Sequence, residues 1–212
     1  MHEKEIDAEK TMVKNFPGLS SPHLLLAASY SSNGQAEKSF AEAVMAFESS
    51  SGDINAEISY LRAFYPATDS SAQLSPAQLK EADSLCSILR RVHPDKSESF
   101  SESGNYFYKE GKMKEAAEMY RKAAGLVTND YLVIKRLMDT DQQQNNTAAL
   151  EKDAKKALEL FPTQSESYFY LGKMYYEKKE YQKAIDMLEA GLDFMQPDEK
   201  KESEIKTISL LF

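Results

Sequence analysis

The chain has 212 residues, of which 42% are hydrophobic and 28% charged, enough to bury a core in one elongated domain or two small ones. Its formal net charge of -8, with acidic residues spread along the chain, argues against a nucleic-acid-binding surface, which needs clustered lysine and arginine. No apolar run approaches the ~20 residues that span a bilayer, and the first residues lack the apolar core of a secretion signal. The composition therefore predicts a soluble protein, cytoplasmic or, if an upstream leader has been removed, periplasmic.

Cysteine and histidine are sparse in the chain. Cys86 is the one cysteine, which excludes an internal disulfide framework and a cysteine-rich zinc site. His2, His23 and His93 are too scattered to predict a metal cluster. Acidic pairs fall in sequence that predicts solvated turns, so catalysis by paired carboxylates has no support. We therefore predict a chain without cofactor, metal or catalytic residue, and not an enzyme.

In chain order, the sequence predicts a series of amphipathic helix pairs. Residues 3–16 predict one helix, and its Asn-Phe-Pro end resembles the Leu-Phe-Pro end of 152–162. Each later unit has apolar residues at three- and four-residue spacing in two segments joined by a short turn, such as 109–112 or 177–180. The predicted units are 20–52, 53–95 with a loop insertion at 66–76, 97–130, 131–164 and 165–197, with a partial unit at 1–17 and a partial unit or capping helix at 199–212.

These units repeat with a period of 34 residues, which is typical of a stacked helical array rather than of a single globular core. Gly104 and Gly172 lie two periods apart, with Met138 at the position between them. Pro162 falls at the end of one unit, and Pro197 falls near the end of the next. Small or apolar residues of the second segments recur in one phase at Ala116, Leu150 and Ala184, at Tyr120, Ala154 and Leu188, and at Ala123, Ala157 and Gly191.

The stretch from 168 to 197, YFYLGKMYYEKKEYQKAIDMLEAGLDFMQP, closely resembles a tetratricopeptide repeat. In that family an aromatic residue is followed by Leu-Gly, Tyr, Ala, Phe, Ala and Pro. Here leucine stands for the phenylalanine, glycine for the last alanine, and the proline comes one residue late. The resemblance implies an all-α fold, a right-handed α-solenoid of stacked antiparallel helix pairs, with 1–212 as a single domain cut from a longer array. The matching residues are Tyr168, Leu171, Gly172, Tyr175, Ala184, Leu188, Gly191 and Pro197.

Gly172 lies inside a predicted helix, where glycine costs on the order of 1 kcal/mol relative to alanine. The resemblance implies that Gly172 faces the small residue Ala184 of the second helix and lets the two helix axes approach closely. Gly104 and Ala116 are expected to form the equivalent contact two units earlier, because close-packed interiors respond to even one extra methylene.

The resemblance also implies a function. In superhelical arrays the first helices line a concave groove that binds a peptide or a partner protein, so we expect a scaffold for protein–protein interaction. By analogy with the family, the side chains that line this groove come from fixed positions of each repeat. They correspond here to Asn105, Tyr108, Lys135, Asp139, Phe169, Lys173 and Tyr176.

Other interpretations remain open. The repeats can be the targeting or regulatory arm of a larger enzyme. His93-Pro94-Asp95 resembles the loop by which J-domain co-chaperones stimulate Hsp70, but the apolar phase continues beyond it, which favours a repeat boundary. The apolar segment 204–212 predicts a weak homodimer, because part of its surface would stay uncovered.

Overall fold

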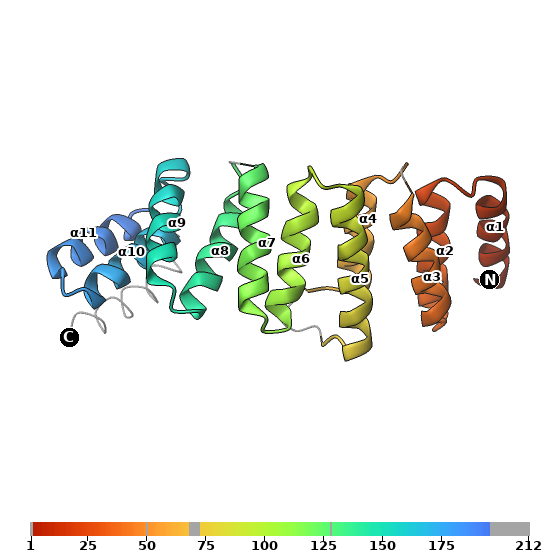
Figure 1. Cartoon of the computed structure of the whole chain (residues 1–212), viewed down its shortest axis with the longest axis horizontal. Coiled ribbons are helices and arrows are strands. Elements are labelled where there is room, and N and C mark those ends of the chain that lie inside the picture. The colour runs from red at the N-terminus through yellow and green to blue at the C-terminus, as the bar shows by residue number, and fades with distance from the viewer. Residues whose placement is uncertain (1, 50, 68–72, 128, 196–212) are drawn as a thin grey trace. The chain divides into compact units, whose positions relative to one another are not determined.

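The computed structural model of the chain describes residues 2–49, 51–67, 73–127 and 129–195 (Figure 1). The regular structure in these ranges consists of eleven α-helices, with no strand. The helices are α1 (His2–Asn15), α2 (Ser20–Ser32), α3 (Ala36–Glu48), α4 (Ile54–Phe64), α5 (Pro76–Val92), α6 (Ser97–Lys109), α7 (Met113–Leu126), α8 (Tyr131–Gln143), α9 (Thr147–Leu160), α10 (Ser165–Glu177) and α11 (Tyr181–Leu192).

The helices form two compact units, which we call the N-terminal unit (1–126, α1 to α7) and the C-terminal unit (127–212, α8 to α11). After α1, the helices follow one another in pairs. The first helices of the pairs are α2, α4, α6, α8 and α10, and the second helices are α3, α5, α7, α9 and α11. That the two units form one solenoid domain over 1–212 stays a prediction.

Several helices begin at a side chain that satisfies the unpaired backbone N–H groups of the first turn. The Asp53 carboxylate accepts from the backbone N–H of Asn55, and the Asp130 carboxylate accepts from that of Leu132, each at 3.0 Å. Ser75 and Gln78 form a reciprocal capping box at the start of α5, whose first residue is a proline. The caps at Asp53 and Asp130 begin the first helices α4 and α8, and the Ser75 cap begins the second helix α5.

The turns inside four of the helix pairs, α2–α3, α6–α7, α8–α9 and α10–α11, share one backbone conformation. Each of these turns contains one residue with a positive φ between 54° and 75°. The four residues are Gly34, Gly111, Asn145 and Lys179. The backbone N–H of the residue after each one donates to a carbonyl five residues earlier, at 2.8–2.9 Å, which closes the first helix as a Schellman motif. Because Gly111, Asn145 and Lys179 are 34 residues apart, the sequence period is also the period of this turn.

The interiors combine small residues of the second helices with larger residues of the first. In the N-terminal unit, Ala43, Ala46 and Ala82 are fully buried beside large apolar side chains, and burial raises the pKa of the Cys86 thiol, which lies in the same core. In the C-terminal unit the core centres on Ala154 and on first-helix residues. Buried residues at the predicted repeat positions are Ala116, Tyr120, Ala123, Tyr168, Leu171, Gly172, Ala184 and Leu188, while Tyr175 is half-buried and Pro162 exposed.

The two helix glycines do allow close packing, but against other side chains than the sequence predicts. A Cβ atom added to Gly172 would lie 2.6 Å from Cγ of Leu188, and the nearest atom of Ala184 is its backbone oxygen at 3.3 Å. A Cβ added to Gly104 would lie 2.6 Å from the Tyr120 ring. Side chains of a helix lean toward its N-terminus, so residues one turn beyond the predicted alanines reach the glycines.

Some sequence predictions fall outside the described residues. These include Pro197, the partial unit at 199–212 and the homodimer through 204–212, as well as the middle of the 66–76 insertion at 68–72. Helix α4 ends at Phe64 and α5 begins at Pro76, and the insertion between them stays a prediction.

Candidate protein-binding site

The structure divides the seven predicted groove residues between the units. Asn105 and Tyr108 lie on α6 in the N-terminal unit. The other five lie in the C-terminal unit on two first helices, α8 and α10, which are joined by side-chain hydrogen bonds. The α8 residues are Lys135 and Asp139, and the α10 residues are Phe169, Lys173 and Tyr176.

On α6, Asn105 belongs to a network inside the fold. Its amide Nδ2 donates to Glu102 at 3.3 Å, and its Oδ1 accepts from the Tyr120 hydroxyl at 2.9 Å. The Glu102 carboxylate is buried and also accepts from Arg62 Nε of α4 at 2.9 Å. Asn105 therefore helps to hold α4, α6 and α7 together, and only part of its hydrogen-bonding capacity is left for a partner.

On α8, both predicted groove residues are satisfied by α10. Lys135 donates to Glu166, and the Tyr131 hydroxyl donates to the other oxygen of that carboxylate at 2.7 Å. Burial opposes the ionisation of Glu166, but these two hydrogen bonds outweigh it and hold the pKa of Glu166 below its ordinary value. Asp139 accepts from the hydroxyl of Tyr170. Lys135 and Asp139 are therefore both already hydrogen-bonded to side chains of α10.

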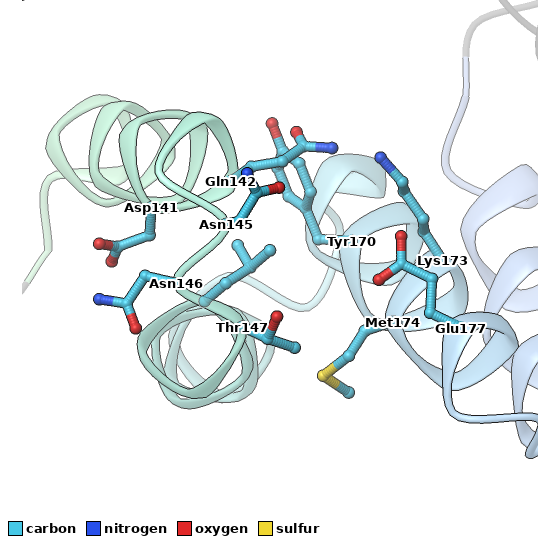
Figure 2. A pocket seen from close by; sticks show the side chains of 10 residues that line it. Asp141, Gln142, Asn145, Asn146, Thr147, Tyr170, Lys173, Met174 and Glu177 are labelled. Atoms are coloured by element: carbon cyan, nitrogen blue, oxygen red, sulfur yellow. The ribbon is translucent and has the colours of Figure 1, made fainter.

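A pocket of about 80 Å³ lies between the end of α8, the turn into α9, and α10. Its buried apolar lining comes from Leu150, Tyr170 and Met174, which would contact the apolar part of a bound side chain. Figure 2 shows residues of α8 and its turn facing residues of α10 across this pocket. The polar lining consists of Asp141, Gln142, Asn145, Asn146, Thr147, Lys173 and Glu177.

Lys173 differs from the other charged groove residues. Its side chain is half-buried at the pocket, and within the described part of the chain it forms no ion pair or hydrogen bond. A half-buried ammonium group that forms no ion pair can gain a charge-assisted hydrogen bond from a partner. Of the predicted residues on α8 and α10, Lys173 is therefore the charged one most open to a ligand.

The two aromatic groove residues of α10 are half-buried and extend the surface on either side of Lys173 in sequence. The Phe169 ring lies 6.0 Å from the Tyr170 ring, and the Tyr176 ring lies 5.7 Å from the Tyr181 ring, both edge to face. Partly exposed aromatic side chains of this kind are common anchors in protein interfaces.

Sequence reasoning missed the pocket residues at the end of α8 and in the α8–α9 turn. Gln142, Asn145 and Asn146 line the pocket but lie outside the first-helix positions that the family analogy supplies. The sequence feature that marks these pocket residues is the polar run from 142 to 147, which predicts a turn but not a binding pocket. In the same described ranges, no three His, Cys, Asp or Glu side chains gather as a metal site would require, and none of the helices combines the length and apolar character of a membrane span.

Residues 154–186 match a family model described as a tetratricopeptide repeat. Over this range the chain is similar to a tetratricopeptide repeat. By sequence, no curated protein matches it. Solved tetratricopeptide-repeat structures share its fold at low sequence identity, so the likeness concerns the fold alone.

Three of these structures illustrate the extent of the match. The alignment with YrrB covers 91% of this chain and 94% of YrrB, with 17% identity and a TM-score of 0.62. On yeast Tom70 it aligns over 97% of its length with 42% of that chain, at 14% identity and a TM-score of 0.62. On PilF of Pseudomonas aeruginosa the coverage is 97% and 99%, at 13% identity and a TM-score of 0.57.

Proposed function

We propose that this tetratricopeptide-repeat chain is a non-enzymatic scaffold whose C-terminal unit binds an extended segment of a partner protein along α8 and α10. Tetratricopeptide repeats generally serve as protein-interaction modules. The observation that carries the proposal is the half-buried Lys173, which forms no ion pair or hydrogen bond in the described ranges, beside a pocket of about 80 Å³. A pocket of this size accommodates one side chain of a peptide rather than a whole small-molecule substrate, which usually needs about 300 Å³ or more.

The surroundings of Lys173 support a peptide ligand. The amides of Gln142 and Asn145 can donate to and accept from peptide groups or polar side chains at the pocket. Phe169 and Tyr176 offer partly exposed rings four residues before and three residues after Lys173 on the same helix, against which apolar partner side chains can pack. This combination of aromatic contacts and a few polar groups is typical of peptide-recognition surfaces.

The fold comparison supports the same class of ligand. YrrB is described as a tetratricopeptide-repeat protein with an unusual peptide-binding site. Its peptide binding is a property of YrrB, and the chain shares 17% identity with it. It is nevertheless an example of peptide binding by a similar arrangement of helices.

A test begins with a phage-displayed library of random peptides selected against the intact chain. The selected peptides are then synthesised, and their affinities measured by fluorescence anisotropy for wild type, Lys173→Glu and Tyr176→Ala. We expect each substitution to weaken binding about tenfold or more, as is usual for interface anchors. Lys156→Glu is the matched control, because it makes the same charge change at an exposed position of the second helix α9.

The control separates local recognition from general attraction of charge. The proposal predicts that Lys156→Glu keeps the wild-type affinity within about threefold. Equal weakening by Lys156→Glu and Lys173→Glu would mean that net charge alone governs binding. Unchanged affinity in both Lys173→Glu and Tyr176→Ala would place the binding surface elsewhere on the chain.

A further inference from the structure

A carboxyl group is buried at the start of α4 in the N-terminal unit. The side chain of Glu57 is 0% exposed, and its Oε2 lies 3.0 Å from Nε2 of His93. Its other oxygen, Oε1, has no hydrogen-bond partner in the described ranges. The turn before α4 closes tightly over this oxygen, since a Cβ added to Gly52 would lie 2.0 Å from it.

The helix packing does not require a carboxyl group at this position. Glu57 is the fourth residue of its first helix, and the fourth residue of each described first helix is buried or half-buried. Three of these five residues are aromatic or aliphatic. An ionised carboxylate with an unpaired oxygen is unfavourable in such a place. The five residues are His23, Glu57, Phe100, Ile134 and Tyr168.

The carboxyl group joins two links between successive helix pairs. Gly52 belongs to the link between α3 and α4, and its backbone N–H donates to Ser49 at 3.0 Å. His93 caps the end of α5 and starts the link to α6, where its carbonyl accepts from the Ser99 hydroxyl at 2.8 Å. The His93-Pro94-Asp95 motif therefore forms a repeat boundary in which the histidine ring contacts Glu57.

We propose that Glu57 and His93 form a proton-operated latch, which holds the α3–α4 and α5–α6 links together while the pair retains a proton and loosens them when the pair loses it. With the proton on Glu57, the carboxylic acid donates to Nε2 of His93, which satisfies the contact at Oε2. Loss of that proton to solvent leaves a buried carboxylate with a neutral imidazole and an unpaired Oε1.

The neighbouring charges favour retention of the proton. Asp53, the N-cap of α4, adds a second negative charge near Glu57, and His93 is the one basic group recorded in contact with the carboxyl among the described residues. Arg91, two residues before His93, is held by Glu48 at the end of α3. The pKa of Glu57 is raised from 4.5 to about 7, mainly by burial and to a smaller extent by the negative charge of Asp53.

The raised pKa of Glu57 determines how the stability of the latch changes with pH. The folded-state pKa of Glu57 is raised above its ordinary value of 4.5. The protonated Glu57–His93 pair therefore contributes its full stabilisation of the fold below pH 4.5. It is lost as the pH rises through about 7. The latch therefore holds under mildly acidic conditions and loosens under mildly alkaline ones.

Hydrogen exchange of the intact chain, read by mass spectrometry and corrected for intrinsic exchange rates, tests the latch. Between about pH 5.5 and about pH 8.5, we expect protection of residues 51–58 and 90–99 to fall about tenfold or more in wild type. Glu57→Gln should remove this fall, because its amide keeps a contact with His93 but does not titrate. Glu42→Gln is the matched control, since Glu42 pairs with His23 at 2.6 Å but its carboxyl is 24% exposed, and this variant should keep the fall.

The unmodified chain supplies a second measurement that does not depend on a variant. In a carbon NMR titration of glutamate carboxyl groups, we expect one glutamate to titrate near neutral pH. Protection that does not change with pH in wild type, or that falls equally in Glu57→Gln, would overturn the latch. So would a chain in which every glutamate titrates below about pH 5, the ordinary range.

Discussion

Replacement of Gly104 by alanine tests the close packing of first and second helices. In an exposed helix this change stabilises by roughly 0.5–1 kcal/mol, because glycine loses more backbone entropy on folding. Here the new Cβ would lie 2.6–2.9 Å from three ring atoms of Tyr120. That ring is 1% exposed, and its hydroxyl donates to Asn105 at 2.9 Å, so it cannot move without loss of packing and of a hydrogen bond.

Overpacking of a filled core costs about 1–3 kcal/mol, which exceeds the gain in helix propensity. We therefore expect Gly104→Ala to lower the free energy of unfolding by about 1–2 kcal/mol, measured by urea unfolding followed by circular dichroism. Gly125→Ala is the matched control in the same unit, because Gly125 is in helix α7 and a Cβ there meets no atom within 4 Å. A Gly104→Ala variant as stable as Gly125→Ala would refute the packing argument.

Three further substitutions have defined outcomes. Lys179→Gly should raise the free energy of unfolding by about 0.5–1 kcal/mol in thermal denaturation, because Lys179 has φ 61° and glycine adopts this conformation without strain. Glycine is the natural residue at the equivalent turn, as Gly111. A lower melting temperature of Lys179→Gly would contradict this reasoning. His93→Ala should cost about 1–3 kcal/mol in urea unfolding, because it leaves the buried Glu57 carboxyl without its hydrogen-bond partner, and an unchanged midpoint would show that the contact is not stabilising. Lys173→Met should change stability by less than about 0.5 kcal/mol, since Lys173 has no partner in the described ranges, whereas a larger loss would reveal a structural role.

The sequence was sufficient to predict the helix pairs, because their determinants are local and periodic. The predicted turns at 109–112 and 177–180 coincide with the ends of α6 and α10 and the starts of α7 and α11. Small residues at a 34-residue period mark where second helices approach first helices, as the complete burial of Ala116 and Ala184 shows. Local spacing, however, left the identity of the glycine contacts uncertain by one helical turn.

The partners of individual polar side chains could not be predicted, because they depend on the distance and rotation between helices. Lys135 and Glu166 are 31 residues apart, and Glu57 and His93 are 36 apart. Nothing in the spacing of a single helix indicates that Lys135 forms an ion pair while Lys173 forms none with the residues that the structure describes. The family analogy therefore selects positions on the first helices, while the structure distinguishes which of those side chains has hydrogen-bonding capacity left for a partner.

The most direct test of the proposed function is hydrogen exchange of the intact chain with and without a peptide selected from the random library. Binding along the first helices of the C-terminal unit predicts slower exchange in α8 and α10, over 131–143 and 165–177, and little change in α11 and in α9 beyond Leu150. The predicted result also includes loss of this protection in Lys173→Glu. Protection confined to α9 and α11, or to the N-terminal unit, would contradict the account.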